Sequence, residues 1–326
     1  MNQLETKNSI FYTVDLQHKV SFEDFISAIP KNYNGIVLKI GEKEPTSNSN
    51  GNAKWSDVYT YDNSNLSYVG EAIYKEYDYD TPYSAYCEKL WSVLGRLVLD
   101  KTRVADIDII KSYRYGDTEI ISHKILDSNT EEAIDFYTLG FHKFSREELT
   151  SMHSVFYIED LLECIRLEVK NEENYKQVEQ QTIETVLLDS ATNNVDRHPA
   201  NWMLIRNKED NWYSLGLFDH SLAFSNMIAE NPFASHGIWA PTYLKTNKME
   251  NWNMKNITRE YGDSLVNYII ENYKTYYEDF MEKMEQQLPT FIEFINNSKY
   301  KHIAGQMMKK RKHMNKILDE GGISYE

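Results

Sequence analysis

Three polar side chains in one stretch of the sequence have types and a spacing that could support chemistry. Asp196 stands in a short polar segment, Asn201 follows it by five residues (201 − 196), and Asp219 ends the second of two apolar runs. These runs, residues 202–205 and 212–218, are separated by a polar turn, and this pattern predicts a β-hairpin. Asn201 and Asp219 should therefore flank the hairpin.

Phosphoryl transfer is a reaction that such residues can support. It requires a carboxylate that orients the attacking hydroxyl or accepts its proton, and oxygen ligands that hold Mg²⁺ against nucleotide phosphates. Asp196 fits the first role, and Asn201 and Asp219 fit the second. The five-residue interval is that of the kinase catalytic loop D-x-x-x-x-N, and Asp219 takes the place of the acid of the D-F-G segment. Only that acid matches, because His220 and Ser221 follow it.

Two segments resemble the HipA-like serine/threonine kinases, whose pattern is N-x-D-R-H-x-x-N-W followed by a strand that ends in Asp. They are residues 194–202, Asn-Val-Asp-Arg-His-Pro-Ala-Asn-Trp, and residues 217–219, Leu-Phe-Asp. The resemblance implies ATP and Mg²⁺ as cofactors and a protein substrate with a Ser/Thr acceptor. It also implies that Asp196 is the catalytic acid-base, that His198 lies beside the phosphates, and that Asn201 and Asp219 are metal ligands.

Other readings of the same residues remain open. Aminoglycoside and choline kinases carry D-x-H-P-x-N, which residues 196–201 also satisfy, and phosphatidylinositol 3/4-kinases carry D-R-x-x-x-N with a later D-H-G. A small-molecule or phosphatidylinositol-type lipid kinase and a nucleotide-binding pseudokinase are therefore alternatives. A hydrolytic metal centre of Asp196, His198, Asp219 and His220 is a further alternative, although it lacks a paired-histidine spacing.

A strand and a helix in the first half of the chain provide candidates for nucleotide binding. Residues 68–76 contain Ala72-Ile73-Tyr74-Lys75, the form of a kinase third strand that ends in lysine, so Lys75 is the candidate for the α/β-phosphates. The helix that should follow has one acid, Glu88, as the possible partner of Lys75. HipA-like members usually carry this glutamate about a turn earlier, where this chain has Ser84. A glutamate on the surface of an amphipathic helix would also need no function.

Residues 51–54, Gly-Asn-Ala-Lys, are similar to a G-x-x-K element of the same family. Gly51 and Lys54 would then bind phosphate through backbone amides and an ammonium group. The surrounding segment is rich in Ser, Asn and Gly, the composition of a mobile loop. The resemblance implies that a hydroxyl of this loop is autophosphorylated, and the added charge would repel ATP. The candidate hydroxyls are Thr46, Ser47, Ser49 and Ser56.

The polar run of residues 127–130 is the clearest boundary in the chain. The resemblance places the adenine-binding hinge just before it, where backbone groups, including those of Lys124 and Leu126, would hold the base. We therefore expect an α+β, two-lobed protein-kinase-like fold with Mg-ATP in the cleft. Its sheet-rich N-lobe would cover residues 1–127, and its mainly helical C-lobe would cover residues 128–326.

The remaining elements follow from apolar periodicity. The expected strands cover residues 10–16, 35–40, 55–61, 68–76, 103–111 and 119–126. The expected helices are one that begins after the N-cap Ser21, one that begins after the N-cap Thr81 with Pro82 in its first turn, and those of residues 155–167, 175–190, 263–287 and 291–318.

Composition restricts the classes of partner. The chain has 326 residues, of which 41% are hydrophobic, enough to bury a substantial core. Its net charge is −15, with 50 acidic and 35 basic residues, so we expect no nucleic-acid binding by the chain itself. Cys87 and Cys164 are the two cysteines, which excludes a disulfide framework and a C-x-x-C zinc site.

We expect a cytoplasmic protein with no transmembrane segment. No stretch approaches about 18 uninterrupted apolar residues, and the first residues lack the apolar run of a secretory signal. Secretion by a route without such a signal stays open. The length suits the stand-alone HipA-like members better than the longer toxins with an antitoxin-binding N-terminal region, so an antitoxin partner is not implied.

Overall fold

The computed structural model describes residues 12–15, 21–41, 53–77, 83–110, 119–151, 156–192, 194, 197, 201–221, 223, 244–245 and 259–296. The chain forms two compact units. The first consists of Met1–Ala85 and Asp106–Lys124, and the second consists of Tyr86–Ala105 and Ile125–Glu326. The expected lobe boundary at residue 127 stays a prediction.

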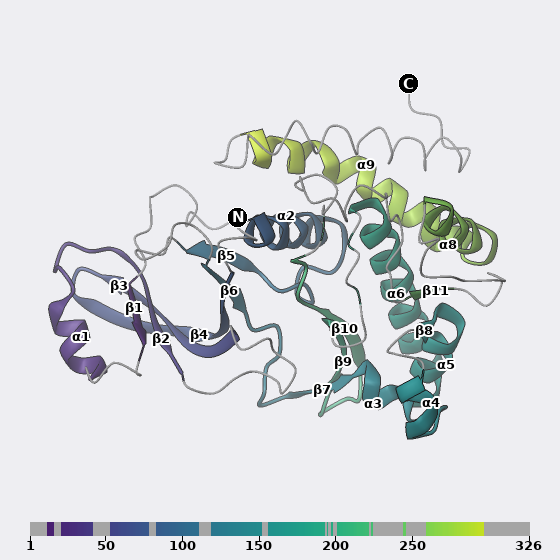
Figure 1. Ribbon diagram of the computed structural model, residues 1–326, viewed down its shortest axis with the longest axis horizontal. Coiled ribbons are helices and arrows are strands. Elements are labelled where there is room, and N and C mark those ends of the chain that lie inside the picture. Colours follow the sequence, from purple (N-terminus) through teal and green to yellow (C-terminus); the bar gives the residue numbers. More distant parts are fainter. Residues whose placement is uncertain are drawn as a thin grey trace. The chain divides into compact units, whose positions relative to one another are not determined.

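The first unit contains a six-stranded sheet with the strand order β1-β2-β3-β4-β6-β5 (Figure 1). Strands β1 and β2 pair in parallel, and the other neighbours pair antiparallel. The strands are β1 (Tyr12–Asp15), β2 (Gly35–Ile40), β3 (Ala53–Asp62), β4 (Asn65–Glu76), β5 (Ile107–Ile110) and β6 (Glu119–His123).

Alternating side chains give this sheet two apolar faces. One face carries a buried cluster, which consists of Ile36, Leu38, Ile40, Val58, Ala72, Tyr74 and Ile121. Val37 and Tyr61 point to the other face, where the side chains of helix α1 (Phe22–Ala28) pack. The Ser21 hydroxyl accepts a hydrogen bond of 3.1 Å from the backbone N–H of Asp24, which confirms the predicted N-cap.

The second unit combines helices with a three-stranded sheet of order β10-β9-β7 and a two-stranded sheet of β11 and β8. The strands are β7 (Glu131–Asp135), β8 (Phe156–Tyr157), β9 (Trp202–Asn207), β10 (Tyr213–Leu217) and β11 (Leu244–Lys245). The helices are α2 (Tyr83–Val98), which begins in the first unit, α3 (Phe136–Gly140), α4 (Arg146–Ser151), α5 (Ile158–Glu168), α6 (Glu172–Thr192), α8 (Arg259–Asn272) and α9 (Lys274–Asn296).

The closing helices divide at a different place from the one expected. Helix α8 ends at Asn272 and α9 begins at Lys274, so Tyr273 separates the two helices. Helix α9 then continues through Pro289 without interruption. A proline inside a helix costs about 3 kcal/mol, but the buried face of α9 continues on both sides of it. The buried residues of this face are Tyr277, Phe280, Met281, Met284, Phe291 and Ile295. Tertiary packing therefore overrides the local signal.

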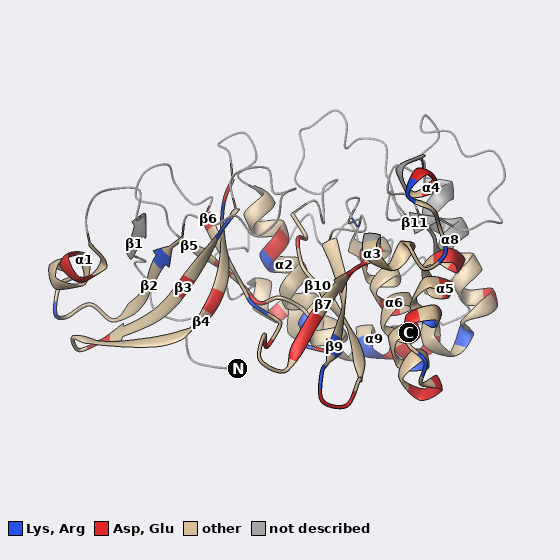
Figure 2. Cartoon of the chain, turned by 90° about the horizontal axis from the view of Figure 1, so that it is seen from below, with Lys and Arg blue, Asp and Glu red and all other residues tan. Residues whose placement is uncertain are grey.

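Charge on the second sheet is concentrated in its edge strand β7, which is acidic along most of its length (Figure 2). Glu131 forms an ion pair of 3.0 Å with Arg103, and Glu132 forms one with Arg206.

Among the described residues, no helix is long and apolar enough to cross a membrane.

Candidate active site

The β9–β10 hairpin places two predicted metal ligands at the same end of a sheet. Trp202 lies opposite Leu217 in the antiparallel register. Asn201 comes immediately before β9, and Asp219 follows β10 by two residues. The backbone N–H of Phe218 donates to the carbonyl oxygen of Asn201 at 3.4 Å. The fold thus brings Asn201 and Asp219 together, although they are 18 residues apart (219 − 201).

Asp219 has a left-handed backbone conformation with φ = 55°. This region is uncommon for residues other than glycine, although Asp and Asn visit it more readily than most. The Ser221 hydroxyl donates to Oδ1 of Asp219 at 3.1 Å. Such conformations persist only where the surrounding structure enforces them, and they cluster at functional sites.

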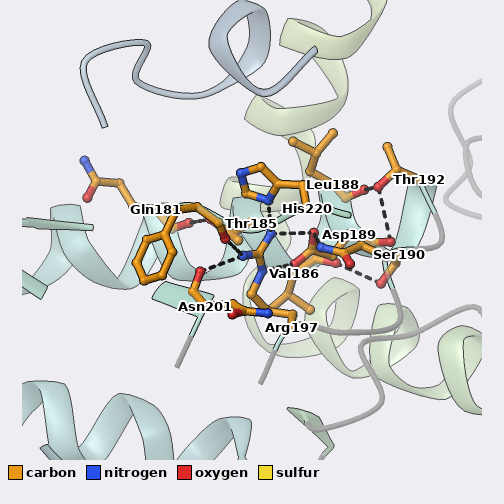
Figure 3. Close-up of polar contacts among 12 residues, drawn as sticks. Gln181, Thr185, Val186, Leu188, Asp189, Ser190, Thr192, Arg197, Asn201 and His220 are labelled. Atoms are coloured by element: carbon orange, nitrogen blue, oxygen red, sulfur yellow. Dashed lines mark hydrogen bonds and ion pairs between the residues drawn. The ribbon is translucent and has the colours of Figure 1, made fainter. Parts of the chain in front are cut away.

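Arg197 is the centre of a buried polar network that joins both ends of the hairpin (Figure 3). Its Nη1 donates to the carbonyl oxygens of Asn201 at 2.8 Å and Phe218 at 3.1 Å. Its Nε and Nη2 donate to the two carboxylate oxygens of Asp189 at 2.7 and 3.1 Å. Both side chains are 0% exposed. Breaking such a pair by removing one partner costs about 3–5 kcal/mol.

Asp189 also binds residues on both sides of Asp196, the predicted catalytic residue. Asn194 donates its backbone N–H to the carbonyl oxygen of Asp189 at 2.9 Å and its Nδ2 to Oδ1 of Asp189 at 2.8 Å. The residues two before and one after Asp196 in the sequence are therefore both bound to Asp189. Asp196 itself and His198 lie outside the described residues.

Sequence reasoning missed Asp189 and Arg197, although signals for both were present. Asp189 follows the apolar run Val-Leu-Leu in a helix, where an acid must find a partner if it is buried. Arg197 lies inside the quoted motif, between Asp196 and His198, but its role becomes visible only when the chain folds back.

Helix α6 holds the edge strand β10 through side-chain amides. Oδ1 of Asn174 accepts from the backbone N–H of Tyr213, and its Nδ2 donates to the Tyr213 carbonyl oxygen, both at 2.7 Å. Two turns further on, Oε1 of Gln181 accepts from the backbone N–H of Leu215 at 2.9 Å. These amides serve as hydrogen-bond partners for a strand edge.

The segment after α2 holds the last residue of β10. Leu217 donates its backbone N–H to Arg103 at 2.9 Å and accepts from the N–H of Ala105 at 3.1 Å. Ser92 of α2 in turn donates to the Ala105 carbonyl oxygen at 2.5 Å. These bonds explain why the strand expected from residue 103 begins only at Ile107, since the intervening backbone pairs with β10.

In the first unit, the sheet register separates two of the predicted phosphate ligands. Lys75 lies opposite Ala53, whereas Lys54 lies opposite Tyr74. Directly paired residues share a face and successive residues alternate, so Lys75 and Lys54 are on opposite faces of the sheet. Gly51 lies outside the described residues.

Trp55 is a further residue on the Lys75 face that sequence reasoning did not single out. It lies opposite Ile73, two residues before Lys75 on β4. The ammonium group of Lys124 is 5.8 Å from the Trp55 ring centre and also forms an ion pair with Glu71. An aromatic residue directly after the G-x-x-K element was the available signal.

The predicted hinge residues lie on either side of the unit boundary. The backbone N–H of Lys124 donates to the carbonyl oxygen of Glu71 at 3.1 Å, so this group is used within the sheet. Leu126 belongs to the second unit and precedes β7. Their contact with a nucleotide base stays a prediction.

The alternative that Glu88 is a surface glutamate is excluded, because α2 is enclosed on most sides and Glu88 is 0% exposed. One expectation about exposure is wrong. Ser56 was counted among the loop hydroxyls, yet it lies inside β3 and is 4% exposed. Lys75 belongs to the first unit and Glu88 to the second, and their pairing stays a prediction.

The residues present fit Mg²⁺ bound together with a nucleotide. This ion takes only one or two carboxylates from the protein and receives its other ligands from phosphates and water. Asn201 and Asp219 provide an amide oxygen and carboxylate oxygens at one end of the hairpin. Within the described ranges, no cluster of three or more His, Cys, Asp or Glu residues could hold a metal ion.

No family model matches the sequence, and no curated protein matches it. Solved structures do share its fold. The proinflammatory kinase CtkA of Helicobacter pylori is 12% identical, with a TM-score of 0.57 over 89% of this chain and 98% of its own. HipA of Shewanella oneidensis, solved with HipB and operator DNA, is 12% identical, with a TM-score of 0.55 over 88% of this chain and 69% of its own.

These neighbours confirm the α+β, kinase-like fold expected from the sequence. The chain therefore has the fold of the HipA-like kinases.

Proposed function

We propose that this chain is an ATP- and Mg²⁺-dependent phosphotransferase, a HipA-like serine/threonine protein kinase that also phosphorylates itself. The observation that carries the proposal is the β9–β10 hairpin. Arg197 binds the carbonyl oxygens of Asn201, before β9, and Phe218, after β10, and so holds together the start and the finish of the hairpin beside Asn201 and Asp219. An oxygen-rich pair held at one end of a sheet suits a metal that is shared with phosphates.

Each residue has a stated part in the proposed reaction. Bound Mg²⁺ supplies charge neutralisation at the nucleotide phosphates. Asn201 and Asp219 hold the metal, and Lys75 binds the α/β-phosphates, with Glu88 as its proposed orienting partner. Asp196 accepts the proton of the attacking hydroxyl. Fixed charges of this kind lower the barrier because they need no reorganisation during the reaction.

Further residues are proposed to complete nucleotide binding. His198, Gly51 and Lys54 contact the phosphates, and backbone groups near Lys124 and Leu126 hold the base. Since Lys54 and Lys75 occupy opposite faces of the sheet, a single bound nucleotide should depend on Lys75 more strongly than on Lys54.

Intact-mass measurement after incubation with Mg-ATP, with and without candidate protein acceptors, tests the proposal. We expect phosphate on the chain or on an acceptor, and none when EDTA removes the metal. Asp219→Ala should abolish Mg²⁺-dependent ATP binding in calorimetric titration while the circular dichroism spectrum is retained.

Glu209→Ala is the matched control, because Glu209 is an exposed acid in the turn at the opposite end of the same hairpin. It should bind Mg-ATP like the wild type. A wild-type chain that neither binds Mg-ATP nor transfers phosphate would refute the proposed function, and a folded Asp219→Ala with full affinity would remove Asp219 from the metal site.

A further inference from the structure

His220 is a buried imidazole directly after the proposed metal ligand Asp219. It is 0% exposed and stacks on Trp91 of α2, with the ring centres 3.6 Å apart and the planes 20° apart. Nη2 of Arg197 lies 2.8 Å from its Nδ1 (Figure 3). The guanidinium carbon of Arg197 is also 5.1 Å from the centre of the Trp91 ring. All three side chains belong to the second unit.

The chemistry of arginine assigns the hydrogen-bond roles in this contact. A guanidinium group only donates, so Nδ1 of His220 must be the acceptor and can carry no proton. His220 is therefore the neutral imidazole with its proton on Nε2. The ring meets two requirements at once: it presents an acceptor edge to Arg197 and a flat face to Trp91.

The same guanidinium group holds the backbone on the other side of Asp219. Phe218 accepts from Nη1 of Arg197 through its carbonyl oxygen, and His220 accepts from Nη2 through its ring. Asp219 lies between these two anchors with φ = 55°. The carbonyl oxygen of His220 further accepts from the backbone N–H of Ala223 at 3.0 Å. Contacts of this kind on both sides of Asp219 can hold it in the left-handed conformation, which costs free energy in a residue other than glycine.

We propose that His220 is a positioning residue for Asp219. Its Nδ1 acceptor, engaged by Arg197, keeps Asp219 in the left-handed conformation that presents the carboxylate to Mg²⁺. The inference rests on the proposed function for the identity of the metal, but the conformational role is a property of the chain itself. Because His220 also stacks on Trp91, the position of His220 depends on the position of α2 as well.

Two substitutions separate the hydrogen bond from the stack. In His220→Asn, Oδ1 of the new side chain takes the place of Nδ1 and can accept from Arg197, but the ring is lost. In His220→Phe, the ring and its stacking face are kept, but Arg197 loses its acceptor. Leu188→Ala is the control for general destabilisation, because Leu188 is a buried apolar residue of α6 (0% exposed).

The first measurement is hydrogen exchange of the peptide that contains residues 216–223, without nucleotide. We expect exchange in this peptide to rise about tenfold in His220→Phe and to stay within about threefold of the wild type in His220→Asn. Leu188→Ala should change this peptide no more than the rest of the second unit. A rise in His220→Phe that is no larger here than elsewhere in the unit would overturn the proposal.

The second measurement is the Mg²⁺ concentration that gives half-maximal ATP binding. It should rise about tenfold or more in His220→Phe, since a bond to a charged group is lost, and less than about threefold in His220→Asn. Wild-type Mg²⁺ dependence in His220→Phe would refute the positioning role. If the wild type shows no Mg²⁺-dependent binding, the proposed function fails, and the exchange measurement still decides whether His220 holds Asp219.

Discussion

At the scale of single residues, Lys75 and Lys54 show how strand alternation decides what a side chain can reach. They stand on neighbouring strands, yet the register assigns them to opposite faces of the sheet. Lys75 shares its face with Ile73 and Trp55, whereas Lys54 shares its face with Tyr74. The two lysines should therefore contribute unequally to nucleotide binding.

We predict that Lys75→Met lowers the rate of phosphate transfer by about 100-fold or more, because fixed charge at the phosphates is lost. Single-turnover transfer measured with saturating Mg-ATP is the appropriate assay. Lys31→Met, at an exposed position of the same unit, should leave the rate unchanged. Full activity of Lys75→Met would mean that another residue binds the α/β-phosphates.

At the scale of elements, α6 supports the site through polar side chains. Its residues from Thr182 to Thr192 are buried on all sides, and its hydroxyls return hydrogen bonds to the helix backbone. Thr182 donates to the Val178 carbonyl oxygen at 2.8 Å, and Ser190 donates to that of Val186 at 2.8 Å. A buried hydroxyl that forms a hydrogen bond costs little free energy of folding. The α6 side chains that hold the hairpin are the carboxylate of Asp189, which acts through Arg197, and the amides of Asn174 and Gln181.

We predict that Asn174→Ala lowers the free energy of unfolding by about 2–4 kcal/mol, because the buried N–H and C=O of Tyr213 both lose their partner. Urea unfolding followed by circular dichroism gives this value. Lys176→Ala, at an exposed position of the same helix, should change it by less than about 0.5 kcal/mol. Equal effects of the two substitutions would show that the amide does not anchor β10.

At the scale of the whole molecule, both thiols are shielded by the fold. Cys87 is 3% exposed and Cys164 is 0% exposed. Burial raises the pKa of Cys164 to about 11, and the nearby acids Asp160 and Glu163 act in the same direction. At pH 8 only about one thiol in a thousand at this position would be ionised, and the thiolate is the reactive form.

We predict that the native protein takes up no alkylating reagent at pH 8 on the timescale of minutes, and that two thiols react after unfolding in urea. Intact mass counts the adducts, and the urea dependence of alkylation should follow the loss of circular dichroism. Rapid reaction of one thiol in the native protein would show that one of these sites opens locally.

The sequence by itself determined the elements that carry the candidate site. Apolar runs bounded by polar turns located the hairpin around Asn201 and Asp219, the strand that ends near Lys75, and the N-cap Ser21. These features depend on local periodicity and turn chemistry, which neighbouring residues specify. The α+β, kinase-like fold followed from their order and from the quoted motif, and it is confirmed.

Only the tertiary structure decided which residues hold these elements in place. Arg197 binds Asp189, eight residues earlier, and His220, 23 residues later, and its connection to both appears only after the chain has folded back. Tertiary packing likewise buries Ser56 and Glu88, and it keeps α9 helical on both sides of Pro289. Long-range contacts and burial depend on what packs against a residue, and no local pattern of the sequence contains that information.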